Sequence, residues 1–319
     1  MLFILRRGGT ALEETRLGPG WRLPEDAVWI ELVNPSREED LAVEAAVGAS
    51  LPTREDMAEI EASSRLYRDN GATVMIATVL CGAEHEAPVL GPVTFVLTGE
   101  RLVTIRYLAP QAFAVFAGQV ERQPELRRSG VDVFLGLLDA IVDRTADLLE
   151  RTSAEVEDIS RAIFAQERGA RFKPILSRLA QAQSVNAKAT ESLVSLARLM
   201  GFATLTGQIE QHGEARPQLR SLQRDVQSLN EHAAYVSGNL IFLLDAALGL
   251  INIEQNEITK IFSIYAVVLL PPTLIATSYG MNFRHMPELG WPLGYPLALL
   301  AMALSALVPF LWFKRKGWL

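Results

Sequence analysis

The chain has 319 residues, of which 49% are hydrophobic and 21% are charged, and its formal net charge at pH 7 is −7. The first 260 residues carry 26 basic and 36 acidic residues, a net charge of −10, which argues against nucleic-acid binding and is compatible with the attraction of cations. The single cysteine, Cys81, excludes a disulfide within the chain and a cysteine-rich metal site.

The first 108 residues mix strand and helix patterns. Ser36 with Glu39 forms a capping box that predicts the start of a helix, and Thr53 with Asp56 predicts another. The sequence "TGER" predicts a hairpin turn between the last two of four predicted strands. The strands are expected at runs rich in β-branched and aromatic residues, namely 27–33, 73–80, 93–99 and 101–107. These patterns predict an α+β or α/β domain.

From about residue 131 onward the pattern becomes helical. Three long helices are predicted at 131–164, 174–202 and about 217–279, separated by segments rich in turn residues. In the third, apolar residues recur at alternating spacings of four and three from Leu222 to Leu250. Such a heptad stripe predicts packing against neighbouring helices, and we expect one continuous rod that leads into the first of two uncharged segments.

These two uncharged segments lie near the end of the chain. Residues 261–283 and 290–313 contain no Asp, Glu, Lys or Arg, and each is long enough to cross a hydrocarbon core as a helix. Lys260 precedes the first and a basic tail, 314–316, comes after the second, whereas the loop between them carries one Arg and one Glu. The positive-inside rule therefore predicts that both termini face the cytoplasm and that the loop faces out.

A polar row runs along the third helix and into the first uncharged segment. Its members are spaced by four and three residues, and all except Leu270 are small or polar: Asp245, Gly249, Asn252, Asn256, Thr259, Ser263, Ala266, Leu270, Thr273, Thr277 and Gly280. Such a row belongs either at a close helix–helix contact or along water. In the second case several copies of the chain each contribute one helix to a pore, and Leu270 forms a hydrophobic constriction that gates by dewetting.

The absence of carboxylates from both uncharged segments limits the ion chemistry. Mg²⁺ gives up its water reluctantly, so such a pore would contact the hydrated ion through hydroxyl, amide and carbonyl oxygens. The amide of Asn282 and the carbonyl groups of Gly280 and Met281 would form a ring at the outer mouth, where Glu288 would raise the local cation concentration. A site that strips a transition metal of its water is disfavoured, because only His285 is near.

The motif "YGMNF", followed by "MPEL" and by a second uncharged segment that ends in "FKRKGWL", resembles the CorA family of magnesium and cobalt transporters, in particular its proteobacterial branch. The likeness is dense over roughly the last 100 residues and more diffuse before them, where "WIELVNPSREE" and the element order are similar. It implies a homopentameric membrane protein with an α+β fold in α/β/α layers. The expected parts are a cytoplasmic funnel domain with long helices (1–215), a stalk helix (216–260), a pore-lining span (261–282), a periplasmic loop (283–289), a second span (290–313) and a basic cytoplasmic tail (314–319).

The resemblance also implies a function. The family moves hydrated Mg²⁺, with Co²⁺ and Ni²⁺ as further candidates, through the bacterial inner membrane down the membrane potential, and it closes when cytoplasmic Mg²⁺ binds between subunits. Gly280, Met281 and Asn282 would form the selectivity entrance. Asn256, Leu270 and Thr273 match pore positions of the family, and Asp245 fits a ring lower in the pore. Thr259, Ser263 and Thr277 belong to the same polar row, so all seven are the expected pore-lining residues.

The resemblance is weaker at the outer loop and at the regulatory metal ligands. The sequence departs from the family at Arg284–His285, where related chains commonly carry an acidic residue, so Glu288 would attract cations alone. The family also pairs an acid on the stalk with one on a neighbouring funnel domain. Asp225 and Glu231 are the candidate regulatory metal ligands, and the alternative for each is a solvated helix charge.

Two other interpretations are open from the sequence. One is a Zn²⁺, Co²⁺ or Ni²⁺ transporter of the same fold, although "MPEL" favours magnesium. The other is a membrane-anchored sensor or enzyme whose spans only tether it. The first 260 residues contain no phosphate loop, nucleophile elbow or zinc-hydrolase motif, so we expect no enzyme and no organic cofactor. The expected partners are further copies of the chain, divalent cations and membrane lipid.

Overall fold

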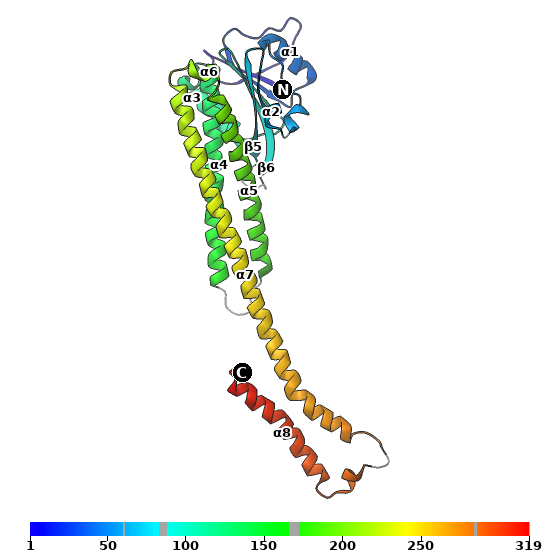
Figure 1. Cartoon of the computed structure of the whole chain (residues 1–319). Helices are drawn as coiled ribbons and strands as arrows, with labels where there is room; N and C mark the ends of the chain where they lie inside the picture. Colours follow the sequence, from blue (N-terminus) through cyan, green and yellow to red (C-terminus); the bar gives the residue numbers. More distant parts are fainter. Residues whose placement is uncertain (60, 83–87, 166–171, 284–285, 319) are drawn as a thin grey trace. The chain divides into compact units, whose positions relative to one another are not determined.

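The computed structural model describes residues 1–59, 61–82, 88–165, 172–283 and 286–318 (Figure 1). These form two units. The first comprises Met1–Ala165 and Lys173–Leu243, and the second is described at Phe172 and over 244–283 and 286–318. The limits of the funnel, stalk, spans and loop that the sequence suggests remain predictions.

A seven-stranded mixed sheet forms the centre of the first unit. Its strands lie in the order β2-β1-β3-β7-β6-β5-β4, and every neighbouring pair is antiparallel except the parallel pair β3–β7. The bounds are β1 (Leu2–Arg6), β2 (Glu13–Thr15), β3 (Ala27–Val33), β4 (Leu66–Asp69), β5 (Ala72–Cys81), β6 (Val89–Thr98) and β7 (Arg101–Arg106).

The four strands predicted from composition are confirmed as β3, β5, β6 and β7. The predicted hairpin turn is also confirmed, because Thr98 pairs with Arg101 and Gly99 takes the positive φ of 54° that the tight turn requires. Sequence analysis missed β1, β2 and β4, which are five, three and four residues long. These strands are too short to show a distinctive alternation of apolar and polar residues.

Both faces of the sheet are covered, which gives the α/β/α layers. Along β5, Met75 and Ala77 belong to one hydrophobic core, whereas Val74 and Ile76 belong to a second core on the other face. The second core includes Val43 of α1 (Arg37–Val47). The predicted capping box starts this helix, but Thr53 and Asp56 start only η1 (Asp56–Ala58), a single 3-10 turn, which precedes α2 (Ala62–Arg65).

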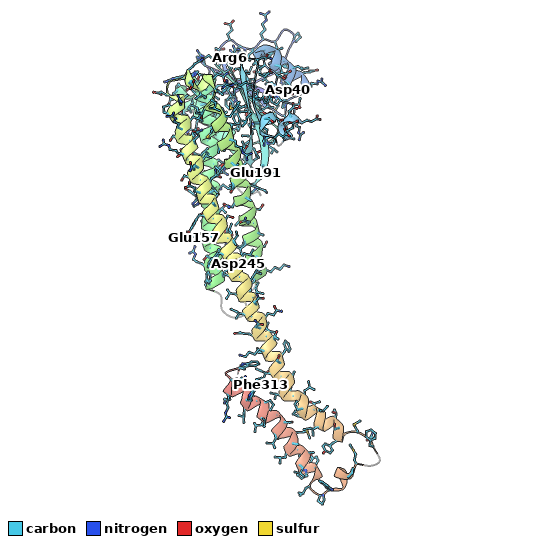
Figure 2. The ribbon with its side chains drawn as sticks, in the orientation of Figure 1. Arg6, Asp40, Glu157, Glu191, Asp245 and Phe313 are labelled. Carbon is cyan, nitrogen blue, oxygen red and sulfur yellow. The ribbon has the colours of Figure 1, made fainter. Side chains whose placement is uncertain are left out.

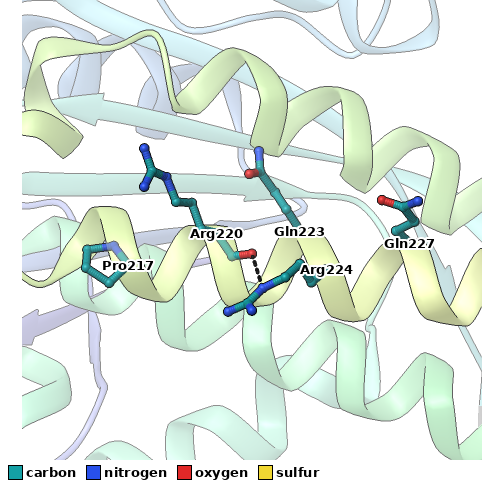
Figure 3. Close-up of a pocket in the computed structure, with 5 residues that line it drawn as sticks. All are labelled: Pro217, Arg220, Gln223, Arg224 and Gln227. Atoms are coloured by element: carbon teal, nitrogen blue, oxygen red, sulfur yellow. Dashed lines mark hydrogen bonds between the residues drawn. The ribbon is translucent and has the colours of Figure 1, made fainter.

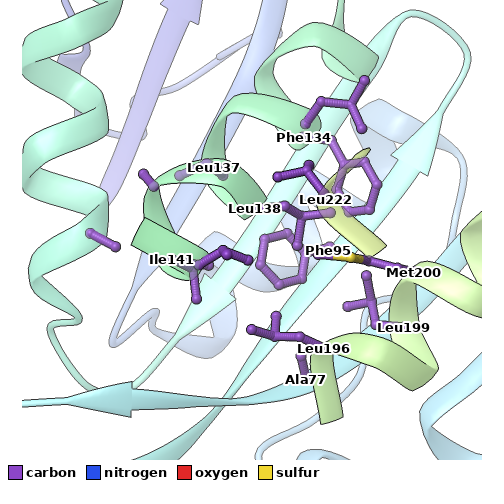
Figure 4. Packing of buried hydrophobic residues seen from close by; sticks show 14 of the residues in the cluster. Ala77, Phe95, Phe134, Leu137, Leu138, Ile141, Leu196, Leu199, Met200 and Leu222 are labelled. Carbon is purple, nitrogen blue, oxygen red and sulfur yellow. The ribbon is translucent and has the colours of Figure 1, made fainter. Parts of the chain in front are cut away.

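Long helices cover the first core. The three helices predicted from periodicity are confirmed as α4 (Gly130–Phe164), α5 (Phe172–Ala203) and α7 (Ala215–Tyr279). Figure 4 shows side chains of β6, α4, α5 and α7 meeting in this core, among them Phe95, Phe134, Met200 and Leu222. The shorter elements α3 (Gln111–Arg122), η2 (Pro124–Arg127) and α6 (Gly207–Glu210) were not predicted.

The heptad stripe of α7 is buried as predicted. Between Leu222 and Leu243 its members are at most 3% exposed, with the exception of the half-buried Leu229. A polar contact adds to this packing, because the Nδ2 of the buried Asn186 on α5 donates to the carbonyl oxygen of Ala233 at 3.0 Å. The stripe therefore holds the first part of α7 to the helices beside it.

A buried ion pair joins the two parallel strands. Glu31 of β3 is 3% exposed, and its Oε1 accepts a hydrogen bond from the Nε of Arg106 on β7 at 2.8 Å. Arg106 also donates to the carbonyl oxygen of Leu108 at 2.9 Å and lies over the ring of Phe113. Burial raises the pKa of the Glu31 carboxyl, and the charge and hydrogen bond of Arg106 oppose this rise only in part.

The second unit contains the remainder of α7, the 3-10 turn η3 (Pro287–Gly290) and α8 (Gly294–Arg315). Both long helices include a stretch that is long and apolar enough to cross a membrane. Helix α7 ends at Tyr279, so the predicted selectivity entrance lies just beyond its last turn. After α8 the ring of Trp318 stacks on Phe313, and the ammonium group of Lys260 lies over the Trp318 ring at 5.5 Å.

Candidate functional site

The polar row lies on one face of α7. A spacing of four and three residues keeps its members aligned, because an α-helix has about 3.6 residues per turn. Every member from Asn256 to Gly280 is exposed in the protomer, and Leu270 is 63% exposed. Asp245, at the start of the row, is also exposed (Figure 2). The structure therefore presents the predicted row as a continuous surface.

The opposite face of α7 is covered by other residues of the same protomer. Ile264 is 7% exposed, and Val268, Pro271, Pro272 and Ile275 are half-buried. At about 100° per residue, the centre of this covered row lies about 160° around the helix from the centre of the polar row. The polar row is therefore left for water or for another copy of the chain, and not for contact within the protomer.

The hydroxyl groups of the row share one hydrogen-bond arrangement. Each donates its proton to the carbonyl oxygen four residues earlier at 2.7–2.9 Å, as seen for Thr259, Ser263, Thr273 and Thr277. Because the single O–H proton is engaged within the helix, each oxygen presents lone pairs outward. Such acceptors match a hydrated cation, whose bound water molecules point their hydrogens away from the ion.

The predicted entrance directly follows the last turn of α7. The N–H of Gly280 donates to the carbonyl oxygens of Ala276 and Thr277 at 3.0 and 3.1 Å, which closes the helix. Met281 and Asn282 come next, and both side chains are exposed. The carboxyl end of a helix carries about half an elementary negative charge, so this end of α7 favours a cation. The helix terminus thus contributes an attraction that the loop sequence alone did not reveal.

Part of the connecting loop is not described. Arg284 and His285, where the sequence departs from the CorA pattern, lie outside the described residues. Glu288 belongs to η3, but its side chain lies outside the described part of the chain as well. Its role in attracting cations therefore stays a prediction.

The two candidate regulatory acids lie apart on α7. Asp225 lies near Asp139 and Asp143 of α4. Partial burial raises the pKa of both of these carboxyl groups, and nearby carboxylates add to the rise, namely Asp143 and Asp225 for Asp139, and Asp147 and Asp225 for Asp143. Glu231 instead accepts a hydrogen bond from the Nε2 of Gln227 at 3.2 Å. Within the described residues of one protomer, no group of three or more His, Cys, Asp or Glu side chains could hold a metal ion.

Sequence reasoning missed Asp139 and Asp143. Their spacing of four residues, continued by Asp147, places acids on one face of α4 and was the available signal. It could not be used without knowing that this face lies near Asp225. The acids of α4 are therefore a finding of the tertiary structure.

A basic surface precedes Asp225 on α7. Arg220 and Arg224 line a shallow hollow with Pro217, Gln223 and Gln227 (Figure 3). The Nε of Arg224 donates to the carbonyl oxygen of Arg220 at 3.4 Å, which leaves the guanidinium groups on the surface. Two guanidinium groups repel a divalent cation, so this hollow is not a metal site.

The chain is similar in sequence to curated magnesium transporters. Residues 24–315 match the family model described as CorA-like Mg²⁺ transporter protein. The chain is 37% identical over 295 residues to the magnesium transport protein CorA of Salmonella typhimurium, and 36% identical over 294 residues to that of Escherichia coli K12. Each alignment covers 92% of this chain and 92% of the relative.

The fold is similar to solved structures that share less sequence. The complete CorA magnesium transporter of Methanocaldococcus jannaschii matches with a TM-score of 0.79 at 19% identity, over 100% of this chain and 99% of that one. Full-length CmaX matches with a TM-score of 0.71 at 15% identity, over 99% and 97% of the two chains. These matches support the predicted architecture of an α/β domain, a long helix and two apolar helices. With the family match over residues 24–315 and relatives at 36–37% identity, they show that this chain belongs to the CorA-like Mg²⁺ transporter family.

Proposed function

We propose that this chain carries hydrated Mg²⁺ passively through the bacterial inner membrane, in a pore lined by the polar row of α7. The observation that carries the proposal is the direction of that row, which faces away from the side of α7 that the protomer covers. The names of the relatives at 36–37% identity support magnesium as the ion. Co²⁺ and Ni²⁺ are further candidate ions.

A pore of this kind requires several copies of the chain. One helix cannot enclose a channel, so each copy supplies one polar row, and the family resemblance favours five copies. The first unit also leaves large apolar side chains of α7 exposed, with Tyr235 at 66% and Phe242 at 60%. Exposed apolar residues on a long helix are typical of a surface that another copy covers.

The pore residues suit an ion that keeps its water. The row offers hydroxyl oxygens with free lone pairs, and Asn282 adds an amide oxygen beyond the helix end. Since no carboxylate lies in either uncharged segment, little there can replace the tightly held water of Mg²⁺. Entry requires no pump, because a potential of 100 mV contributes about 2.3 kcal/mol per elementary charge and hence about 4.6 kcal/mol for a divalent cation.

Leu270 is the proposed gate. It is the one large apolar member of the row and is 63% exposed on the row's face. A ring of leucine side chains from several copies would expel water from a narrow pore and so block a hydrated ion. Closure would result from binding of cytoplasmic Mg²⁺ between subunits, where Asp225 or Glu231 of one copy supplies a ligand.

The topology is inferred from the charges. The basic residues 314–316 and Lys260 are placed on the cytoplasmic side, together with both termini and the first unit. The loop between the two apolar helices then faces the periplasm, and Asn282 lies at the outer mouth. In this proposal Mg²⁺ is both the transported and the regulatory ion, and the protein has no enzymatic activity and no organic cofactor.

The test is Mg²⁺ influx into proteoliposomes that contain a fluorescent indicator and hold an inside-negative potential. We expect fast influx for the wild type and loss of influx for Asn282→Ala. The control is Asn239→Ala, the same substitution on the stalk part of α7 and on the face opposite to the polar row. Equal influx in both variants would contradict the entrance assignment. Influx of Zn²⁺ without influx of Mg²⁺ would instead favour a zinc carrier of the same fold.

A further inference from the structure

A second surface feature lies at the carboxyl end of α8. A hollow of about 510 Å³ is lined by Val308, Leu311, Trp312, Lys314 and Arg315. Its first residues are apolar and its last two are basic, so it changes character along the helix. We propose that this hollow binds an anionic phospholipid of the cytoplasmic leaflet, with the phosphate group at Lys314 and Arg315 and the start of an acyl chain against Val308 and Leu311.

The hollow faces away from the protomer. Val308, Leu311, Trp312 and Arg315 are spaced by three, one and three residues, so they share one face of α8. The residues of α8 that are partly or fully covered in the protomer form another row: Gly294, Ala298, Met302, Ser305, Ala306, Pro309 and Phe313. At about 100° per residue, the two rows are centred about 110° apart. The exposed fractions of Val308 and Leu311 are 63% and 48%, as expected for side chains that contact lipid.

The charges of the hollow are available to a ligand. Among the residues that the structure describes, neither Lys314 nor Arg315 forms an ion pair with a carboxylate. Two nearby ammonium groups make cation–π contacts instead. Lys316 lies over the ring of Trp312 at 4.6 Å, and Lys260 lies over the ring of Trp318. Two cations therefore remain beside the hollow for a phosphate group.

Trp312 marks the depth of the site. Along α8 it comes after the apolar and before the basic residues of the hollow, and tryptophan is enriched where the hydrocarbon core meets the lipid headgroups. Basic residues after a span set topology in many membrane proteins, but topology alone requires no hollow. Basic residues immediately on the cytoplasmic side of a span are attracted to the anionic lipids of that leaflet. The inference rests on the membrane orientation proposed above, but it does not depend on which ion is carried.

The test is native mass spectrometry of the full-length protein, with phosphatidylglycerol or phosphatidylcholine of the same acyl chains added in detergent. For the wild type we expect preferential retention of phosphatidylglycerol. In Lys314→Gln/Arg315→Gln its affinity should fall roughly 30-fold, because both attractions to an anionic headgroup are lost. The matched control is Arg220→Gln/Arg224→Gln, which removes two charges from the first unit and should retain the lipid preference.

Three results would overturn the proposal. The first is equal retention of the two lipids by the wild type, and the second is unchanged retention of phosphatidylglycerol in Lys314→Gln/Arg315→Gln. The third is loss of the oligomer in that variant with no change in lipid preference, which would assign the face to another copy of the chain. Because the readout is bound lipid mass, absence of Mg²⁺ influx would count against the proposed function and leave this inference standing.

Discussion

Replacing Arg106 by methionine should reveal the cost of burying the Glu31 carboxylate. The substitution removes the 2.8 Å hydrogen bond to Glu31, the bond to the carbonyl oxygen of Leu108 and the position over Phe113. Because Glu31 is only 3% exposed, it would be left as a buried charge without its partner. Breaking a buried pair in this way costs about 3–5 kcal/mol.

A double variant separates the buried charge from the lost packing. In Glu31→Leu/Arg106→Met both charges are gone and apolar side chains of similar size remain. Replacement of a whole buried ion pair by apolar residues is often close to neutral, so we expect this variant to recover most of the stability lost in Arg106→Met. The difference between the two variants then measures the unpaired carboxylate.

The pH dependence provides a second signature. The folded-state pKa of Glu31 is raised, so the folded protein binds a proton more readily than the unfolded chain does. The stability that this group contributes is therefore fully present below its unfolded pKa and is lost as pH rises through the folded pKa. Without Arg106 the folded pKa should rise further. The destabilisation in Arg106→Met should consequently be larger at pH 8 than at pH 5.

Hydrogen exchange followed by mass spectrometry can measure the loss of stability in Arg106→Met in the full-length protein. The amides of β3 and β7 should exchange about 10²- to 10³·⁵-fold faster in Arg106→Met, at about 1.4 kcal/mol per factor of ten. The amides of α8 in the second unit serve as the internal reference and should not change. The reasoning is refuted if the single variant is no less stable than the double variant, or if its cost is the same at both pH values.

Three further predictions concern other parts of the chain. Burial raises the pKa of the Cys81 thiol to about 11, so N-ethylmaleimide at pH 8 should label it only after denaturation, and fast labelling of the folded protein would contradict its burial. The pKa of Asp139 is raised in the folded protein, so the stability that this group contributes to the folded state is lost as pH rises. Asp139→Asn should therefore raise the free energy of unfolding at pH 8, by less than about 1 kcal/mol for a largely exposed group, and should have little effect at pH 4. Leu270→Ser should increase Mg²⁺ influx at high internal Mg²⁺, and wild-type influx under those conditions would argue against a hydrophobic gate.

Much of the fold could be predicted from local patterns. The strands β3, β5, β6 and β7 are rich in β-branched and aromatic residues, and α4, α5 and α7 are long enough for their periodicity to be clear. The helix predicted from Thr53 and Asp56 was wrong in length, because the same capping contacts can start a single 3-10 turn. Whether a longer helix grows from such a start depends on packing, which the capping residues do not encode.

The candidate site was predicted in part. The polar row and the motif at its end are visible in the sequence, because a helix converts spacings of three and four residues into one face. The sequence could not show which face of α7 the protomer covers, since that depends on Ile264, Val268 and Ile275 losing exposure in the folded unit. It also could not bring Asp139 of α4 close to Asp225 of α7, because 86 positions separate them along the chain.

The central claim is that the polar row, and not the opposite face of α7, lines the ion pathway. A single cysteine can test this directly, because replacing the buried Cys81 by serine gives a background without other thiols. In that background we would compare Thr273→Cys with Ile275→Cys, two positions on the same turn of α7, in proteoliposomes treated with a charged, membrane-impermeant thiol reagent. We predict that the reagent blocks Mg²⁺ influx through Thr273→Cys and leaves influx through Ile275→Cys unchanged. Block at Ile275→Cys without block at Thr273→Cys would contradict the account.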